Sequence, residues 1–143
     1  MLADRTEQVD LEAAASPETP VGKLESLARN GADLVRRKVA ANPNTPGEIL
    51  QLLSKDANSA VRAAVATNPN TPHHLVAHLA RDVEVTVRKA LAEDRQTPLE
   101  LLNVLAEDAD QSVSLVARAT RKDHPYRAQG ELPGCPDTFI KTA

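Results

Sequence analysis

The chain has 143 residues, of which 41% are hydrophobic and 26% are charged, and its formal net charge is −3. That length and apolar content suffice for one folded domain, while the slightly negative balance gives no strong overall attraction to nucleic acid or acidic membranes. Cys135 is the only cysteine, which excludes an internal disulfide and any zinc or iron–sulfur site held by cysteines alone.

The first ten residues carry acidic side chains and no long apolar run. We therefore expect neither a signal peptide nor a membrane span here, and a cytoplasmic protein. Residues 1–18 also match the second half of the repeat that follows, because Asp4, Val9 and Ala13 stand in its register. We expect them to form a lone helix that covers the first full repeat.

A Thr-Pro step returns every 26 residues along the chain. Its four copies begin at Thr19, Thr45, Thr71 and Thr97. A fixed period of this size is typical of a solenoid, in which each repeat is one supersecondary unit stacked on the next. The predicted domain covers residues 1–122, with the half-repeat at 1–18 and full repeats at 19–44, 45–70, 71–96 and 97–122.

Each repeat begins with an expected short helix. We predict that its threonine is the N-cap and that the following proline takes the first helical position, where a missing N–H costs nothing. Two apolar residues follow, three positions apart, and they recur in every repeat as one buried stripe. In the second repeat these are Leu50 and Leu53.

A second expected helix completes each repeat. A polar residue, Asn30, Asp56, Asp82 or Asp108, closes the first helix and can cap the next one. Valines, with leucine or alanine in the later copies, recur four positions apart and again mark one buried face. The helix should stop at Asn42-Pro43 and Asn68-Pro69, because a residue before proline is pushed out of the α region.

After residue 122 the pattern ends. Residues 123–143 hold three prolines and two glycines, which exclude a long helix. They also contain Tyr126, Leu132, Phe139 and Ile140. These apolar side chains favour a segment that covers the end of the last repeat, with a mobile tail carrying a short partner-binding motif as the alternative.

The order Thr-Pro, two spaced leucines, Asp, then Val-Arg-x-x-Val-Ala-x-Asn-Pro resembles the bacterial variant leucine-rich repeat, and its second half is similar to HEAT repeats. Residues 45–70 match best, and the resemblance runs from residue 4 to about 122. Later copies depart from it: Asp94-Arg95 replaces Asn-Pro, and Ser114 replaces the arginine. The resemblance implies a curved superhelix of paired short helices and no catalytic residues.

Basic residues crowd the second helices and make the main candidate site. They are Arg36, Arg37, Lys38, Arg62, Arg88 and Lys89. Arg36, Arg62 and Arg88 follow the repeated valines, so they can form a ladder with the aspartates or helix-end carbonyls, as the likeness to HEAT repeats favours. Alternatively, these side chains form a positive stripe that binds an acidic protein surface or phosphates.

Other chemistry has little support. His74 and His78 lie one helical turn apart, as two zinc ligands can, but no third and fourth ligand is close in the sequence. Cys135 lies between glycine and proline and is interpreted as an exposed thiol rather than a nucleophile. We predict no catalytic residue, no cofactor and no metal.

The sequence thus predicts an all-α, right-handed α-solenoid with a 26-residue repeat. Alanines crowd the second helices, and small side chains permit close approach, so we expect these helices on the concave side. The expected function is a non-enzymatic scaffold that binds another protein along this concave face. Binding of nucleic acid or another polyanion through the basic stripe is the alternative, although the repeats hold no aromatic residues for base stacking. The partner's identity and the oligomeric state stay open.

Overall fold

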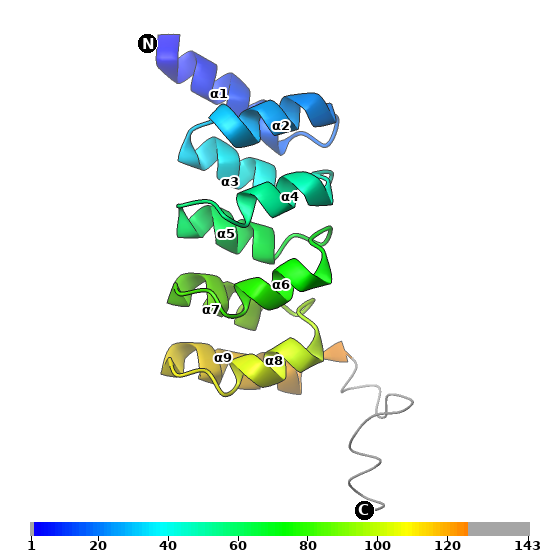
Figure 1. Ribbon diagram of the computed structural model, residues 1–143, viewed down its shortest axis with the longest axis vertical. Coiled ribbons are helices and arrows are strands. Elements are labelled where there is room, and N and C mark those ends of the chain that lie inside the picture. The colour runs from blue at the N-terminus through cyan, green and yellow to red at the C-terminus, as the bar shows by residue number, and fades with distance from the viewer. Residues whose placement is uncertain (1, 126–143) are drawn as a thin grey trace, which may run out of the picture.

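The computed structural model describes residues 2–125, which form nine helices and no strand (Figure 1). The helices are α1 (Leu2–Ala15), α2 (Val21–Asn30), α3 (Asp33–Ala41), α4 (Gly47–Leu53), α5 (Ser59–Ala66), α6 (His73–Leu79), α7 (Val85–Glu93), α8 (Leu99–Leu105) and α9 (Gln111–Lys122). The prediction of an all-α solenoid is confirmed. The predictions for Tyr126, Leu132, Cys135, Phe139 and Ile140 concern residues outside the described range.

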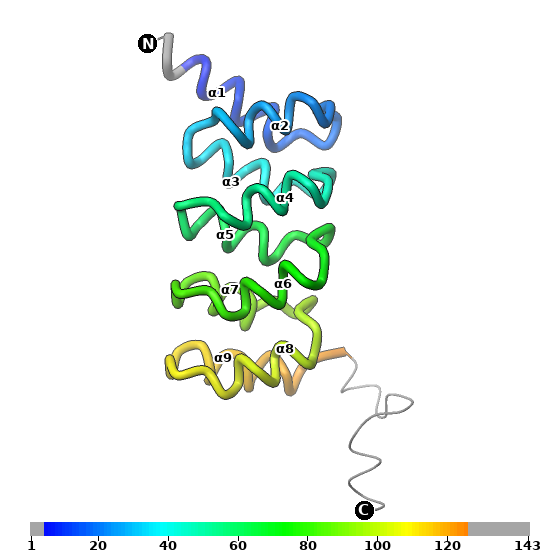
Figure 2. Tube along the Cα trace, viewed as in Figure 1, coloured from blue at the N-terminus to red at the C-terminus, as the bar shows by residue number. Residues whose placement is uncertain are grey.

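Four helix pairs stack along the long axis of the molecule, with α1 at one end and the α8–α9 pair at the other (Figure 2). Each odd-numbered helix packs on the next odd-numbered helix, and these contacts are more extensive than those between neighbouring even-numbered helices. Closer packing of one row is what the inner side of a curved stack requires. The odd-numbered row is thus the more extensively packed of the two, and its place on the concave side stays a prediction.

The core consists of the repeated aliphatic positions. Both leucine stripes of the first helices and both valine stripes of the second helices are buried. Leu24, Leu50 and Leu102 are fully buried on the even-numbered helices, and Val61 and Val87 on the odd-numbered ones. Burying one such side chain contributes about 1.5–3 kcal/mol, so each pair gains stability by covering its stripes with the neighbouring pairs.

The repeated threonines do not cap the helices that follow them. Pro20, Pro46, Pro72 and Pro98 are the N-caps of the first helices, with extended backbone, and no side-chain hydrogen bond is made there. The threonine hydroxyls point back instead: Thr45 donates to the carbonyl oxygen of Val39 at 2.6 Å. The prediction of threonine N-caps was wrong, because the last carbonyls of the preceding helix offer the hydroxyl a nearer acceptor.

The repeated aspartates also do not cap the second helices. The N-caps of α5 and α9 are Asn58 and Asp110, each of which accepts a hydrogen bond from the backbone N–H two residues on. Asp56 lies two residues earlier, and its carboxylate accepts from the backbone N–H of Asn58 at 2.9 Å. It closes the turn between the two helices, while its other oxygen stays available for a neighbour.

Two buried asparagines connect successive repeats where the second helices end. The amide nitrogen of Asn42 donates to the carbonyl oxygens of Ala14 and Ser16, at 2.8 and 2.9 Å. Asn68 donates in the same way to Ala40 and Asn42, at 2.7 and 2.9 Å. Each asparagine thereby satisfies carbonyls that the preceding helix end leaves free.

His124 marks the end of the described chain. It is buried, and its Nε2 atom lies 3.2 Å from the carbonyl oxygen of Thr97. Within residues 2–125, no helix combines the length and apolar character needed to cross a membrane.

Candidate functional site

Three arginines of the second helices form a ladder that links the repeats. Arg62 donates from Nε and Nη2 to the two carboxylate oxygens of Asp82 in the next repeat, at 2.8 and 3.1 Å. Its Nη1 atom donates to the carbonyl oxygen of Asp56 in its own repeat, at 2.7 Å. Arg88 makes the equivalent bonds to Asp108 and to the carbonyl oxygen of Asp82.

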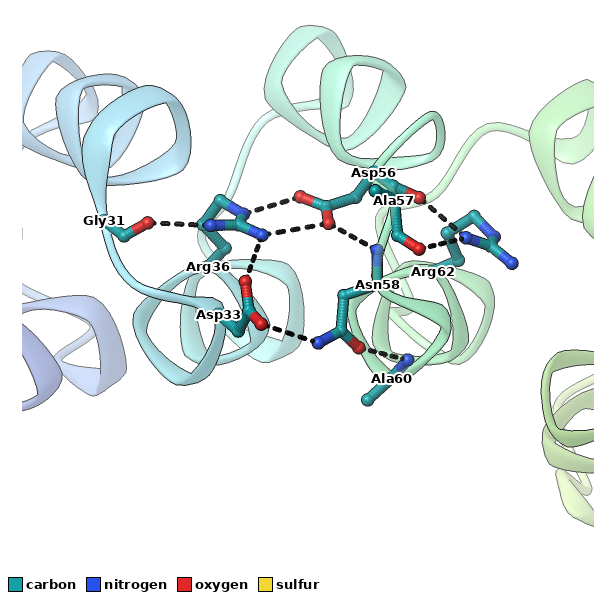
Figure 3. A network of polar contacts seen from close by, with 8 residues as sticks. All are labelled: Gly31, Asp33, Arg36, Asp56, Ala57, Asn58, Ala60 and Arg62. Atoms are coloured by element: carbon teal, nitrogen blue, oxygen red, sulfur yellow. Dashed lines mark hydrogen bonds and ion pairs between the residues drawn. The ribbon is translucent and has the colours of Figure 1, made fainter.

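The first step of the ladder has an additional carboxylate. Arg36 contacts both oxygens of Asp56, the carbonyl oxygen of Gly31 and, at 2.5 Å, one oxygen of Asp33 (Figure 3). The other oxygen of Asp33 accepts from the side chain of Asn58 (Figure 3). The planar guanidinium thus joins two repeats through a bidentate carboxylate contact, which a lysine could not reproduce.

These contacts shift the ionisation of the aspartates. Burial alone would raise the pKa of Asp56, Asp82 and Asp108, but the hydrogen bonds from the arginine and from a backbone N–H outweigh it, so each pKa is lowered. The pKa of each arginine is raised, chiefly by the hydrogen bond to its aspartate. Both partners are therefore charged at neutral pH.

The ladder engages half of the basic residues proposed as a binding site. Only 20%, 13% and 16% of the side-chain surface of Arg36, Arg62 and Arg88 is exposed, and their donors are directed at partners within the fold. Any surface that these helices present to a partner is consequently made by the side chains beside the ladder.

Arg37 and Lys38 are the exposed basic side chains of α3. Neither makes an ion pair or side-chain hydrogen bond with the residues that the structure describes. Lys89, on α7, is half-buried, and its Nζ atom lies 3.9 Å from Glu93 Oε1. The two cations on α3 are thus the ones on this face with full freedom to meet an outside anion.

A cleft of about 420 Å³ runs beside these cations, over α3, α5 and α7. It is lined by Arg37, Ala41, Ala60, Ala63, Ala64, Thr67, Thr86 and Ala90. Apart from Arg37, every one of these side chains is small, so the floor is shallow and mostly apolar. We refer to these eight residues, with the adjoining Lys38, as the inner face.

Two apolar residues extend this face onto α9, where sequence reasoning did not place a site. Leu115 is 55% exposed and occupies the position that Arg37 and Lys89 take in earlier repeats. Val116, in the next position, is half-buried. Reading the repeat positions across all four copies would have shown that the face changes from basic at α3 to apolar at α9.

The histidines of α6 lie on the other row of helices. His74 and His78 are exposed, and His73 Nε2 lies 3.1 Å from Glu100 Oε1. Within the described part of the chain, no three His, Cys, Asp or Glu side chains are grouped as metal ligands.

Comparison with known proteins identifies the repeat. A family model described as the Leucine Rich Repeat Variant domain matches the chain twice, over residues 8–67 and 37–95. The two matches together span well over half of the chain. No curated protein and no solved structure matches it significantly.

Proposed function

The chain belongs to the Leucine Rich Repeat Variant family, and from this we propose that it is a non-enzymatic scaffold that binds another protein along the inner face. The family points to a repeat-protein scaffold. The cleft across α3, α5 and α7 is the observation that carries the finer proposal, because it combines a continuous small-residue floor with unpaired cations at one edge.

The shape of the inner face suits an elongated protein segment. Alanine and threonine side chains leave room for a partner's larger side chains, which can then bury apolar surface against the floor. The face spans three successive second helices, so a bound segment would run along the stack rather than into a single pocket. Concave surfaces of this kind are the usual binding surfaces of solenoids.

The charges favour an acidic partner. Arg37 and Lys38 are exposed at the α3 end, whereas Leu115 offers apolar surface at the α9 end. A segment with carboxylates at one end and an apolar residue at the other would complement both. Because the ladder arginines are already paired, a polyanion such as nucleic acid would find few free cations here, which makes this alternative weaker.

Paired charge reversals test the proposal. In a capture experiment from the source cell, Arg37→Glu combined with Lys38→Glu should abolish retention of a protein that the wild type retains. The melting temperature should stay nearly unchanged, because exposed charges contribute little to stability. The matched control is Glu48→Lys combined with Gln51→Lys on the exposed surface of α4, which should retain the partner.

Retention that survives the α3 reversals but fails with the α4 variant would place the site on the outer row. A duplex DNA shift assay at two salt concentrations separates the alternative. Strong binding to DNA that weakens steeply with salt, and is lost with the α3 reversals, would favour the polyanion function instead.

A further inference from the structure

The connections between repeats are not all alike. At the first two junctions, a pair of asparagines spans from one repeat to the one before it. Asn42 donates to two carbonyl oxygens, and Asn44 donates to a third, that of Pro17, at 2.6 Å. Asn68 and Asn70 make the same three contacts one repeat later, with Asn70 donating to Pro43. Three side-chain hydrogen bonds thus close each of these junctions.

The third junction has lost all three bonds. Asp94 and Gln96 stand where the asparagine pairs stand before, and neither donates a side-chain hydrogen bond across the junction. A carboxylate at position 94 offers acceptor oxygens in place of the N–H donors of an amide. The carbonyl oxygens of Ala66, Asn68 and Pro69, which correspond to the acceptors used at the earlier junctions, therefore receive no side-chain donor from the next repeat.

The position of the carboxylate follows from the turn that it makes. Asp94 Oδ1 accepts from the backbone N–H of Gln96 at 2.9 Å. Asn42 and Asn68 make the same turn through Oδ1, at 2.9 and 2.8 Å. Because the turn is the same, the second carboxylate oxygen of Asp94 corresponds to the donating amide nitrogen of Asn42 and Asn68. An oxygen atom at this position supplies no hydrogen for the neighbouring carbonyls to accept.

An open cleft of about 380 Å³ lies at this junction. Ala66, Asn68, Pro69, Asp94 and Gln96 line it, with His73 on the wall. His73 is paired with Glu100, at 3.1 Å, and Asp94 is the one carboxylate among the lining residues. The cleft therefore offers carbonyl and carboxylate oxygens that a positively charged N–H donor can satisfy together.

We propose that this cleft, at the junction between the α5–α6 and α7–α8 loops, is a binding site for a guanidinium group. An amide NH₂ spans two carbonyl oxygens at 2.7–2.9 Å in the closed junctions. A guanidinium presents the same planar N–H donors and has further N–H groups for a bidentate contact with a carboxylate. A calcium ion fits less well, because it takes six to eight oxygen ligands and a single carboxylate lines the cleft.

The site adjoins the inner face at Thr67, which lines both clefts, but the proposal does not depend on the scaffold function. The guanidinium can belong to an arginine side chain of a partner or to a small molecule, and both share the chemistry that the cleft requires.

The test is a titration of the ¹⁵N-labelled protein followed by NMR. Millimolar methylguanidinium chloride should shift the backbone amides of residues 66–71 and 94–97 in a saturable way, while sodium chloride at equal ionic strength should not. A parallel titration compares the blocked tripeptides Gly-Arg-Gly and Gly-Lys-Gly. Tighter binding of the arginine peptide than of methylguanidinium assigns the site to a protein arginine, and equal binding assigns it to a small molecule.

The variant Asp94→Asn, combined with Gln96→Asn, restores the donors of the closed junctions. It should raise the melting temperature and weaken methylguanidinium binding at least tenfold. Asp94→Ala removes the carboxylate without restoring a donor and should also weaken binding tenfold, so a folding defect in one variant leaves the other informative. Unsaturable shifts in the wild type, binding by both variants as tight as that of the wild type, or a saturable response to calcium chloride alone would overturn the proposal.

Discussion

At the scale of single residues, the repeated threonines form hydrogen bonds with a different partner from the one that the local sequence predicts. Thr45 precedes a proline and a helix, yet its hydroxyl donates backwards to Val39 and closes the preceding helix. Thr71 and Thr97 do the same with Val65 and Leu91. The hydroxyl thereby satisfies a buried carbonyl at the place where the chain leaves one repeat and enters the next.

The contribution of one core position is the first prediction. Leu53→Ala should lower the free energy of unfolding by about 2–5 kcal/mol, because it removes a buried side chain from a packed stripe. Leu53 is 1% exposed, whereas Gln51 on the same helix is exposed. Gln51→Ala is thus the control and should stay within about 0.5 kcal/mol of the wild type. Urea unfolding of both proteins is the measurement, and equal losses would mean that the buried face of α4 has been misidentified.

At the scale of elements, the Arg–Asp ladder orients each second helix against the next repeat. Each guanidinium contacts a carbonyl of the turn before its own helix on one side and a carboxylate of the next repeat on the other, so it fixes the positions of two successive turns relative to one another. The apolar stripes drive the stacking, but they are uniform along the stack and specify its register only loosely. The directional ladder contacts supply that register.

The ladder should make stability depend on acidity. The pKa of Asp82 is lowered in the folded protein, so the unfolded chain binds the proton more tightly. Its contribution is therefore complete above the ordinary aspartate pKa of about 3.9 and is lost as the pH falls through the lower folded value. Asp82→Asn should cost about 1.5–3 kcal/mol at pH 7, and this difference from the wild type should shrink towards pH 2.

Urea unfolding at pH 7, 4 and 2.5 measures this effect. Glu48→Gln, which alters an exposed carboxylate on α4, is the control and should follow the wild type at every pH. A deficit of the Asp82 variant that is the same at all three values would contradict the ionic role of the ladder.

At the scale of the whole molecule, stability is distributed along one dimension. Each pair contacts its neighbours in the stack, and α1 packs mainly on α3 and α2. In such arrays the total stability is approximately a sum of repeat terms and nearest-neighbour interfaces. Central elements such as α5, with an odd-numbered helix on either side, should therefore open less often than α1.

Native-state hydrogen exchange measures this gradient directly. Amides of α5 and α7 should exchange most slowly and those of α1 fastest, with protection factors that differ by at least tenfold. Leu53→Ala should reduce protection in α4 and α5 more than in α9, because its effect passes through successive interfaces. Uniform protection from α1 to α9 would show that the described part of the chain unfolds as a single unit instead.

Much of the architecture could be read from the sequence. The spacing of Leu50 and Leu53, and of Val61 and Val65, determined the helices and their buried faces, because such spacing reflects the local geometry of one helix. The return of the Thr-Pro step every 26 residues indicated a stacked array, because a fixed period of this size is typical of a solenoid. The aligned repeats also showed departures, such as Asp94 in place of asparagine and Ser114 in place of arginine.

Only the tertiary structure decided which partners these residues find. Asp56 could have bonded an arginine of its own repeat through the side chain, but it receives Arg36 from the repeat before. The hydroxyl of Thr45 bonds the preceding helix and not the following one. An open cleft lies beside Asp94, whereas Asn68 closes the equivalent junction with hydrogen bonds. These outcomes depend on the offset between successive repeats. A periodic pattern in the sequence indicates that the repeats recur. The packing of side chains between two repeats determines how far one repeat is displaced and rotated relative to the repeat before it.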